Sequence, residues 1–172
     1  MLIYSLLMAE FFNTFNSKIF SAQPHFSPNT LFTYLMTLNY VLMIVMSFVI
    51  WIATSFLFHL FAVLFDGQAE YKNFQKVTGL AYGVPAVFIL IAIVLIDRVQ
   101  VSQNNFSNFL KTDETIRNTG WLMNTGGMAY YFVIIPVIKY LYNISWLRSI
   151  GVITIPMASI YLLGQFFVKF IF

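Results

Sequence analysis

The sequence predicts an all-α fold: a polytopic integral membrane helical bundle of about four to five transmembrane helices, since each crossing takes about 20 residues. Hydrophobic residues make up 60% of the 172 residues and charged residues only 9%. A water-soluble domain carries about 25% charged residues, so a lipid bilayer is the expected surrounding of this chain. We predict one membrane domain spanning residues 1–172.

Residues 1–28 are predicted to form a short apolar segment and a loop. The apolar part, Met1 to Phe12, is too short to cross a bilayer unaided. Three alternatives remain: an interfacial helix, the stub of a span, or a half-buried segment packed on the bundle. Residues 13–29 are polar and contain two prolines, which favours a loop.

Residues 29–65 are predicted to form one long helix. The stretch Leu31–Phe65 has 35 residues without Asp, Glu, Lys, Arg, Gly or Pro. A helix of that length measures about 50 Å, which exceeds the roughly 30 Å hydrocarbon core. We therefore expect a long or bent helix whose first third protrudes or lies at the interface.

Three further transmembrane helices are predicted at residues 79–97, 121–142 and 146–171, with polar segments at residues 66–76 and 99–118 before the first two. The pair Asp66-Gly67 is expected to end the long helix, and both residues are also candidates for a functional or packing role. Trp121 and Trp146 open the last two spans, as is typical of the aromatic belt at a membrane interface.

The composition also argues against several classes of function. The chain has no cysteine, and its two histidines and six acidic residues are widely spread, so no metal site is expected. The nine Lys and Arg form no run of three, so neither a polybasic lipid-binding patch nor a nucleic-acid partner is expected. We find no catalytic signature, and we predict a non-enzyme with no catalytic residues and no cofactor.

His59 is the first candidate functional residue, because it is an ionisable side chain within an apolar span. Such a group is costly in a membrane and is expected to face a polar partner. It could serve as a proton relay or ion ligand. The interpretation that we favour is a neutral histidine near the membrane face, bonded to a backbone carbonyl or to a loop residue.

Gly79, Tyr82, Gly83 and Pro85 form the second candidate element. Glycines four residues apart allow a neighbouring helix to approach closely, and proline bends the span. The element is either a hinge or binding point, or a site of tight packing against the span of His59, with Tyr82 reaching a polar group. In the packing interpretation, Gly83→Leu costs more stability than Gly164→Leu.

Pro136 and Pro156 are the last candidates, one in each of the last two spans. Together with Pro85 they could line a cavity, and the aliphatic residues around them would favour lipid tails over ions. The alternative is that they only bend the helices, which membrane proteins tolerate where neighbours satisfy the freed carbonyl.

The run from Phe58 to Tyr71 contains the end of a span and a Gly-containing loop. The small-aromatic-small element Ala81-Tyr82-Gly83 and Pro85 follow it along the chain. A later run extends from Ser145 to Pro156. In this order the features resemble the YIP domain family, the Ypt/Rab-interacting membrane proteins and their bacterial relatives, over residues 30–172.

The resemblance implies an α-helical integral membrane protein. Eukaryotic members of the family bind Rab-type GTPases, reticulon-like partners or one another in membrane traffic. The molecular activity of the bacterial members is mostly unknown. The chain opens at Met1-Leu2 without a long acidic or proline-rich segment, which favours a bacterial-type member in the inner (plasma) membrane.

The sequence supports two functional hypotheses. The leading one is a non-enzymatic multi-pass membrane protein that acts as a partner-binding or assembly subunit, in contact with the lipid bilayer and with a protein partner or a second copy. The alternative is a small transporter or channel for lipid-like or apolar cargo, built around His59 and the bends at the three prolines.

Overall fold

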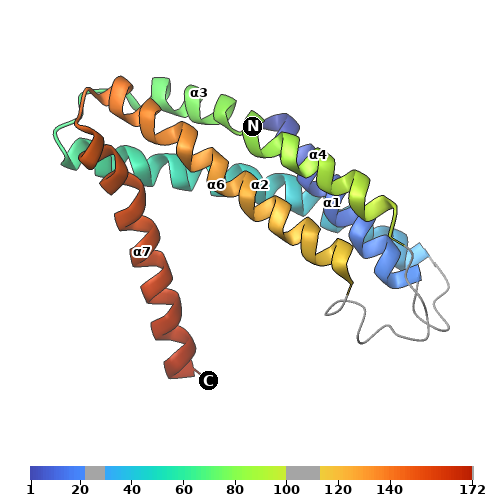
Figure 1. The fold of residues 1–172 in the computed structure, drawn as a ribbon. Helices are drawn as coiled ribbons and strands as arrows, with labels where there is room; N and C mark the ends of the chain where they lie inside the picture. The colour runs from blue at the N-terminus through green and yellow to red at the C-terminus, as the bar shows by residue number, and fades with distance from the viewer. Residues whose placement is uncertain (22–29, 100–112, 172) are drawn as a thin grey trace. The chain divides into compact units, whose positions relative to one another are not determined.

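The computed structural model describes residues 1–21, 30–99 and 113–171. Within these ranges the regular secondary structure is helical throughout (Figure 1). The helices are α1 (Leu2–Ser21), α2 (Thr30–Leu64), α3 (Tyr71–Ala81), α4 (Gly83–Asp97), α6 (Glu114–Tyr142) and α7 (Trp146–Ile171). The prediction of an all-α fold is confirmed.

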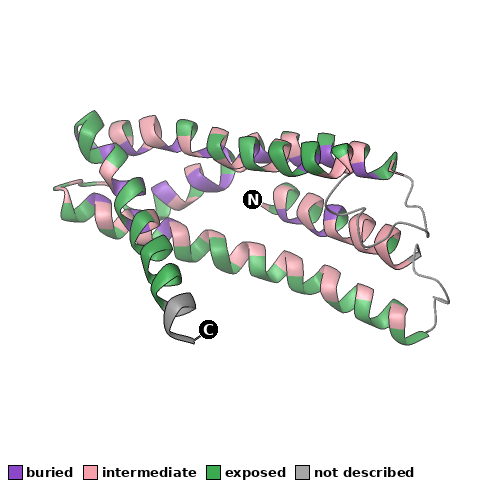
Figure 2. Cartoon of the chain, turned by 60° about the horizontal axis from the view of Figure 1, so that its bottom comes forward, coloured by how far each residue is buried: buried purple, intermediate pink, exposed green. Residues whose placement is uncertain are grey.

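Four helical stretches are long and apolar enough to cross a membrane: Thr30–Leu64, Tyr71–Asp97, Glu114–Tyr142 and Trp146–Phe166. The second of them combines α3 and α4, and α1 is not among the four. Exposed Leu, Ile, Val or Phe residues occur in all four stretches, and Figure 2 shows exposed residues along much of the helices. Such a surface suits lipid rather than water, and the chain is an α-helical multi-pass membrane protein.

Several helices extend into segments predicted as loops. Helix α1 continues to Ser21, beyond the loop start predicted at residue 13. Helix α6 begins at Glu114 rather than at residue 121, because the Asp113 carboxylate accepts a hydrogen bond from the Ile116 N–H at 3.0 Å and caps the helix. The other parts of these two predicted loops, residues 22–29 and 100–112, lie outside the described residues.

Helix α3 occupies half of the predicted connector, since it begins at Tyr71 rather than at residue 79. It buries Phe74 and Thr78 and exposes Lys72 and Lys76. This one-sided burial stabilises an amphipathic helix despite its low average hydropathy.

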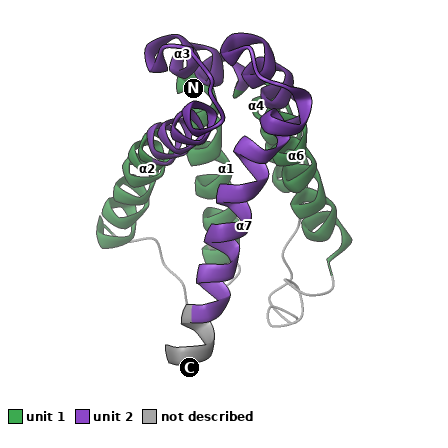
Figure 3. Cartoon of the chain, turned by 90° about the vertical axis from the view of Figure 1, so that its left-hand side faces the viewer, with its two compact units in different colours: residues 1–49, 82–130 green, residues 50–81, 131–172 purple. Residues whose placement is uncertain are grey.

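The chain divides into two compact units (Figure 3). Unit 1 comprises Met1–Val49 and Tyr82–Tyr130, and unit 2 comprises Ile50–Ala81 and Tyr131–Phe172. Helices α1 and α4 belong to unit 1, and α3 and α7 belong to unit 2. Helices α2 and α6 contribute to both.

In unit 1, α1 packs on α4, which matches the third alternative for the N-terminal segment. Phe11 of α1 lies in a buried cluster with Ile89, Ala92 and Ile96 of α4. Lys18 donates hydrogen bonds to the carbonyls of Asp97 and Val99 at the end of α4. A cation at the C-terminus of a helix binds the unpaired carbonyls and complements the helix dipole.

A close contact in unit 1 joins α6 to α4 at Gly126. A Cβ built on Gly126 would lie 2.8 Å from the Cβ of Phe88, too close for real atoms. A Cβ built on the next residue, Gly127, would meet no described atom within 4 Å. Packing therefore requires glycine at only one of these two adjacent positions.

We expect Gly126→Ala to destabilise the protein, because overpacking costs about 1–3 kcal/mol. The matched variant Gly127→Ala should be neutral or stabilising, since alanine favours a helix by up to about 1 kcal/mol over glycine. Thermal unfolding in a mild detergent measures both. Equal shifts of the melting temperature in the two variants would contradict the described contact.

Candidate functional site

The structure distributes the nine candidate residues over both units. Tyr82, Gly83 and Pro85 belong to unit 1, and the others, His59, Asp66, Gly67, Gly79, Pro136 and Pro156, belong to unit 2. They therefore do not form one site within either unit, and each group is described by itself.

In unit 2, α2 and α3 are joined by a buried hydrogen-bond cluster around Thr78. The Thr78 hydroxyl donates to the Gln75 carbonyl at 2.9 Å. Its single proton is then used, so the Ser55 hydroxyl and the Trp51 indole N–H, each 3.1 Å away, both donate to it. This cluster was not predicted from the sequence, although hydroxyl residues within apolar stretches are a possible signal of buried hydrogen bonds between helices. Gly79 follows Thr78 and is buried too.

Helix α2 ends in a Schellman motif. The Gly67 N–H donates to the Ala62 carbonyl at 2.9 Å and the Asp66 N–H to the Val63 carbonyl at 3.0 Å, which is the pattern of that motif. Asp66, with φ at 66°, adopts the left-handed conformation. The Asp-Gly pair does stop the helix, but the residue in the left-handed position is the aspartate.

Gly67 is required for a different reason, which is the close approach of neighbouring atoms. A Cβ at this position would lie 2.7 Å from the Ala62 carbonyl oxygen and 2.8 Å from Cδ1 of Tyr142. The next residue, Gln68, donates its N–H to the Tyr142 carbonyl at 3.4 Å. The end of α2 therefore lies directly against the end of α6.

Helix α6 ends in the same way as α2. Asn143 has φ at 54°, and the Ile144 N–H donates to the Lys139 carbonyl at 3.2 Å. Asn and Asp are the residues other than glycine that tolerate this conformation best. Two non-glycine residues thus end the two helices that meet here.

His59 is bonded to Tyr142. The distance between its Nδ1 and the tyrosine hydroxyl oxygen is 2.6 Å, and the side chain of His59 is half-buried. Its ring centre lies 5.2 Å from that of Tyr71. The position is five residues before the end of α2 at Leu64, about 8 Å along the helix axis. The partner is a side chain of another helix, not the backbone carbonyl or loop residue expected from the sequence.

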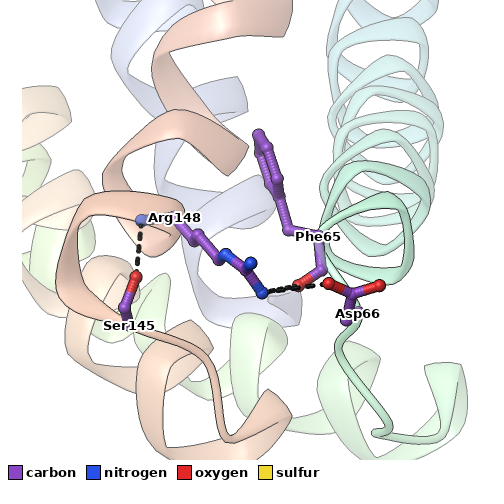
Figure 4. A network of polar contacts seen from close by, with 4 residues as sticks. All are labelled: Phe65, Asp66, Ser145 and Arg148. Atoms are coloured by element: carbon purple, nitrogen blue, oxygen red, sulfur yellow. Dashed lines mark hydrogen bonds and ion pairs between the residues drawn. The ribbon is translucent and has the colours of Figure 1, made fainter.

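Asp66 forms an ion pair with Arg148, close to the start of α7 (Figure 4). Nη1 of Arg148 donates to the Asp66 carboxylate at 3.1 Å and to the Phe65 carbonyl at 3.0 Å. Ser145 caps α7 by accepting the Arg148 N–H at 3.3 Å. Exposed ion pairs of this kind contribute only about 0–1 kcal/mol, so the contact chiefly orients the start of α7.

In unit 1, Tyr82 occupies the break between α3 and α4. Its ring centre lies 4.8 Å from that of Tyr4 and 4.6 Å from that of Tyr130. Pro85 is in the first turn of α4 and lacks the N–H that would bond the carbonyl of Ala81, where α3 ends. The proline therefore explains the position of the break.

The expectation that Gly83 packs tightly is wrong. A Cβ built there would meet no described atom within 4 Å. The physical reason is the break at Tyr82, after which the buried side of α4 is formed by Pro85 and Ala86 rather than Gly83. Gly164 is equally open among the described residues, so the predicted difference between Gly83→Leu and Gly164→Leu has no structural basis.

Pro136 and Pro156 lie inside α6 and α7. Proline there leaves the carbonyl four residues earlier without its helical hydrogen bond. Pro156 is fully buried, and the Tyr131 hydroxyl lies 3.9 Å from the sulfur of Met157. Pro156 is therefore packed within unit 2, and the residue that follows it contacts α6.

No family model, no curated protein and no solved structure matches this chain. Over the residues that the structure covers, no three His, Asp or Glu side chains gather as metal ligands would. The geometry defines an α-helical multi-pass membrane protein, whose unit 2 is organised around the contacts of Tyr142.

We expect Gly67→Ala to destabilise unit 2 strongly, because the added methyl group would contact a backbone oxygen that cannot move without disrupting the end of α2. The cost should be about 1–3 kcal/mol. Unfolding in detergent measures it, with Gly83→Ala as the control at an open position. If Gly67→Ala is as stable as Gly83→Ala, the close approach at Tyr142 is not present.

Proposed function

We propose that this chain is a non-enzymatic multi-pass membrane protein of the YIP type that acts as a partner-binding or assembly subunit, in a bacterial inner membrane. The observation that carries the proposal is the exposed second half of α7. Every residue from Ala158 to Phe166 is exposed (Figure 2), whereas the first half of α7 buries Val152, Ile153 and Pro156.

One face of this exposed helix is not simply apolar. Thr154, Ala158, Tyr161 and Gln165 follow one another at spacings of four, three and four residues, which places them on one helix face. All four are exposed. Small and polar residues of this kind are enriched where transmembrane helices associate.

Gln165 gives this face its strongest tendency to associate. No hydrogen bond joins its side chain to the described residues. In the hydrocarbon region, an amide without a partner is costly because no water replaces the missing hydrogen bonds. A helix of a partner or of a second copy can supply them.

The resemblance to the YIP family supports the same class of function. It rests on the run from Phe58 to Tyr71 and on the element Ala81-Tyr82-Gly83 with Pro85. Eukaryotic members of that family act through protein partners in membranes, and no reaction is needed to explain the residues described above.

Purification in a mild detergent should therefore recover a homo-oligomer or a complex with one defined partner. We expect Gln165→Leu to lower the associated fraction, with a roughly three- to eighteen-fold weaker association constant, because interhelical hydrogen bonds in membranes contribute about 0.6–1.7 kcal/mol. Light scattering combined with size-exclusion chromatography measures the mass.

Leu163→Ile is the matched control, since Leu163 is exposed on the opposite face of the same helix. It should leave the association unchanged. A wild-type protein that is strictly monomeric and free of partners contradicts the proposal, as does an equal effect of the two substitutions.

A further inference from the structure

Three basic side chains of unit 2 have no carboxylate partner among the described residues, and in unit 1 the same holds for Arg98. In unit 1, Lys18 pairs with Asp97 and Arg117 with Glu114. In unit 2, Arg148 pairs with Asp66, but Lys72, Lys76 and Lys139 have no carboxylate within 4.0 Å among the described residues. Among its described side chains, unit 2 therefore carries three basic groups whose charge no carboxylate neutralises.

These three lysines lie at the same end of unit 2. Lys72 and Lys76 are in the first turns of α3, and Lys139 is in the last turn of α6. The two helix ends are in contact, because the rings of Phe74 and Tyr142 lie 5.3 Å apart. The acidic groups at this end are Asp66, which is paired with Arg148, and Glu70, which accepts a hydrogen bond from Asn73 at 3.4 Å.

Lys139 is the most defined of the three. Its ammonium group lies 4.2 Å from the centre of the Tyr140 ring and 5.0 Å from that of Trp146. Cation–π contacts at these distances hold the ammonium in place without neutralising its charge. The group remains able to bind an anion and has a restricted set of positions from which to do so.

The surrounding residues indicate where this cation lies in a membrane. Tyr140 is 72% exposed and Trp146 is 50% exposed, and Leu147 beside them is 81% exposed. Exposed Tyr and Trp at the ends of transmembrane helices are typical of the headgroup level of the bilayer. An anion that meets Lys139 at this level, with its apolar part alongside the exposed leucine, has the chemistry of an anionic phospholipid.

We propose that Lys139, Tyr140 and Trp146 form a binding site for the headgroup of an anionic phospholipid. The ammonium of Lys139 donates to the lipid phosphate, and the two rings pack beside the upper part of the acyl chains. Lys72 and Lys76 raise the local positive potential, which attracts anionic lipids to basic groups close to the membrane surface. The site is independent of the partner contact proposed for α7.

Quenching of tryptophan fluorescence by brominated lipids tests the site directly, because Trp146 is part of it. The full chain carrying Trp51→Phe and Trp121→Phe leaves Trp146 as its single tryptophan, since the sequence has three. This protein is reconstituted into phosphatidylcholine vesicles containing either brominated phosphatidylglycerol or brominated phosphatidylcholine. We expect phosphatidylglycerol to bind near Trp146 about fivefold more strongly at low salt, the effect of one lysine near a membrane surface.

Lys139→Gln should reduce this preference to less than about twofold, since the charge that attracts the phosphate is removed. Lys139→Arg should retain the preference. Arg98→Gln, which removes another basic side chain unpaired among the described residues, is the control and should have no effect because Arg98 is not part of the proposed site.

Three results would overturn the proposal. The first is equal quenching by both brominated lipids in the protein with Lys139. The second is a preference that survives Lys139→Gln. The third is weak quenching by either lipid, which means that a protein partner or a second copy covers Trp146.

Discussion

Tyr142 occupies the point at which three elements of unit 2 meet, and the geometry of each depends on it. Its hydroxyl bonds His59 of α2, its carbonyl accepts from Gln68 in the connector, and its ring lies against Phe74 of α3. Only 1% of the residue is exposed. A smaller side chain here would leave a cavity and a half-buried histidine without its partner, and both are costly in a membrane interior.

The helix ends around Tyr142 satisfy a second constraint of the bilayer, which is that backbone groups must find partners within the protein. Helices α2 and α6 both end in left-handed residues, Asp66 and Asn143, whose following N–H groups return to the last turn. The remaining carbonyl of Phe65 accepts from Arg148. The connectors can therefore be short and still lie close to the membrane, which brings His59, Lys139 and Trp146 to one end of unit 2.

The hydrophobic stretches predicted the membrane class, the long helix α2 and the position of α7, because apolar length alone determines whether a helix can span a bilayer. The candidate site was harder to predict. The contact between His59 and Tyr142 joins residues 83 positions apart, and no local pattern encodes it. Gly83 was misjudged because a glycine spacing assumes an unbroken helix, whereas Tyr82 interrupts it.

A double-mutant cycle between His59 and Tyr142 tests the central role of their contact most directly. The free energy of unfolding in mixed micelles is measured for the original protein, His59→Phe, Tyr142→Phe and the double variant. We expect the two substitutions to be coupled by about 0.6–1.7 kcal/mol, the range for hydrogen bonds between membrane helices. The pair His59→Phe and Tyr140→Phe, which share no described hydrogen bond, should be additive. If His59→Phe and Tyr142→Phe are also additive within about 0.3 kcal/mol, the hydrogen bond does not organise unit 2.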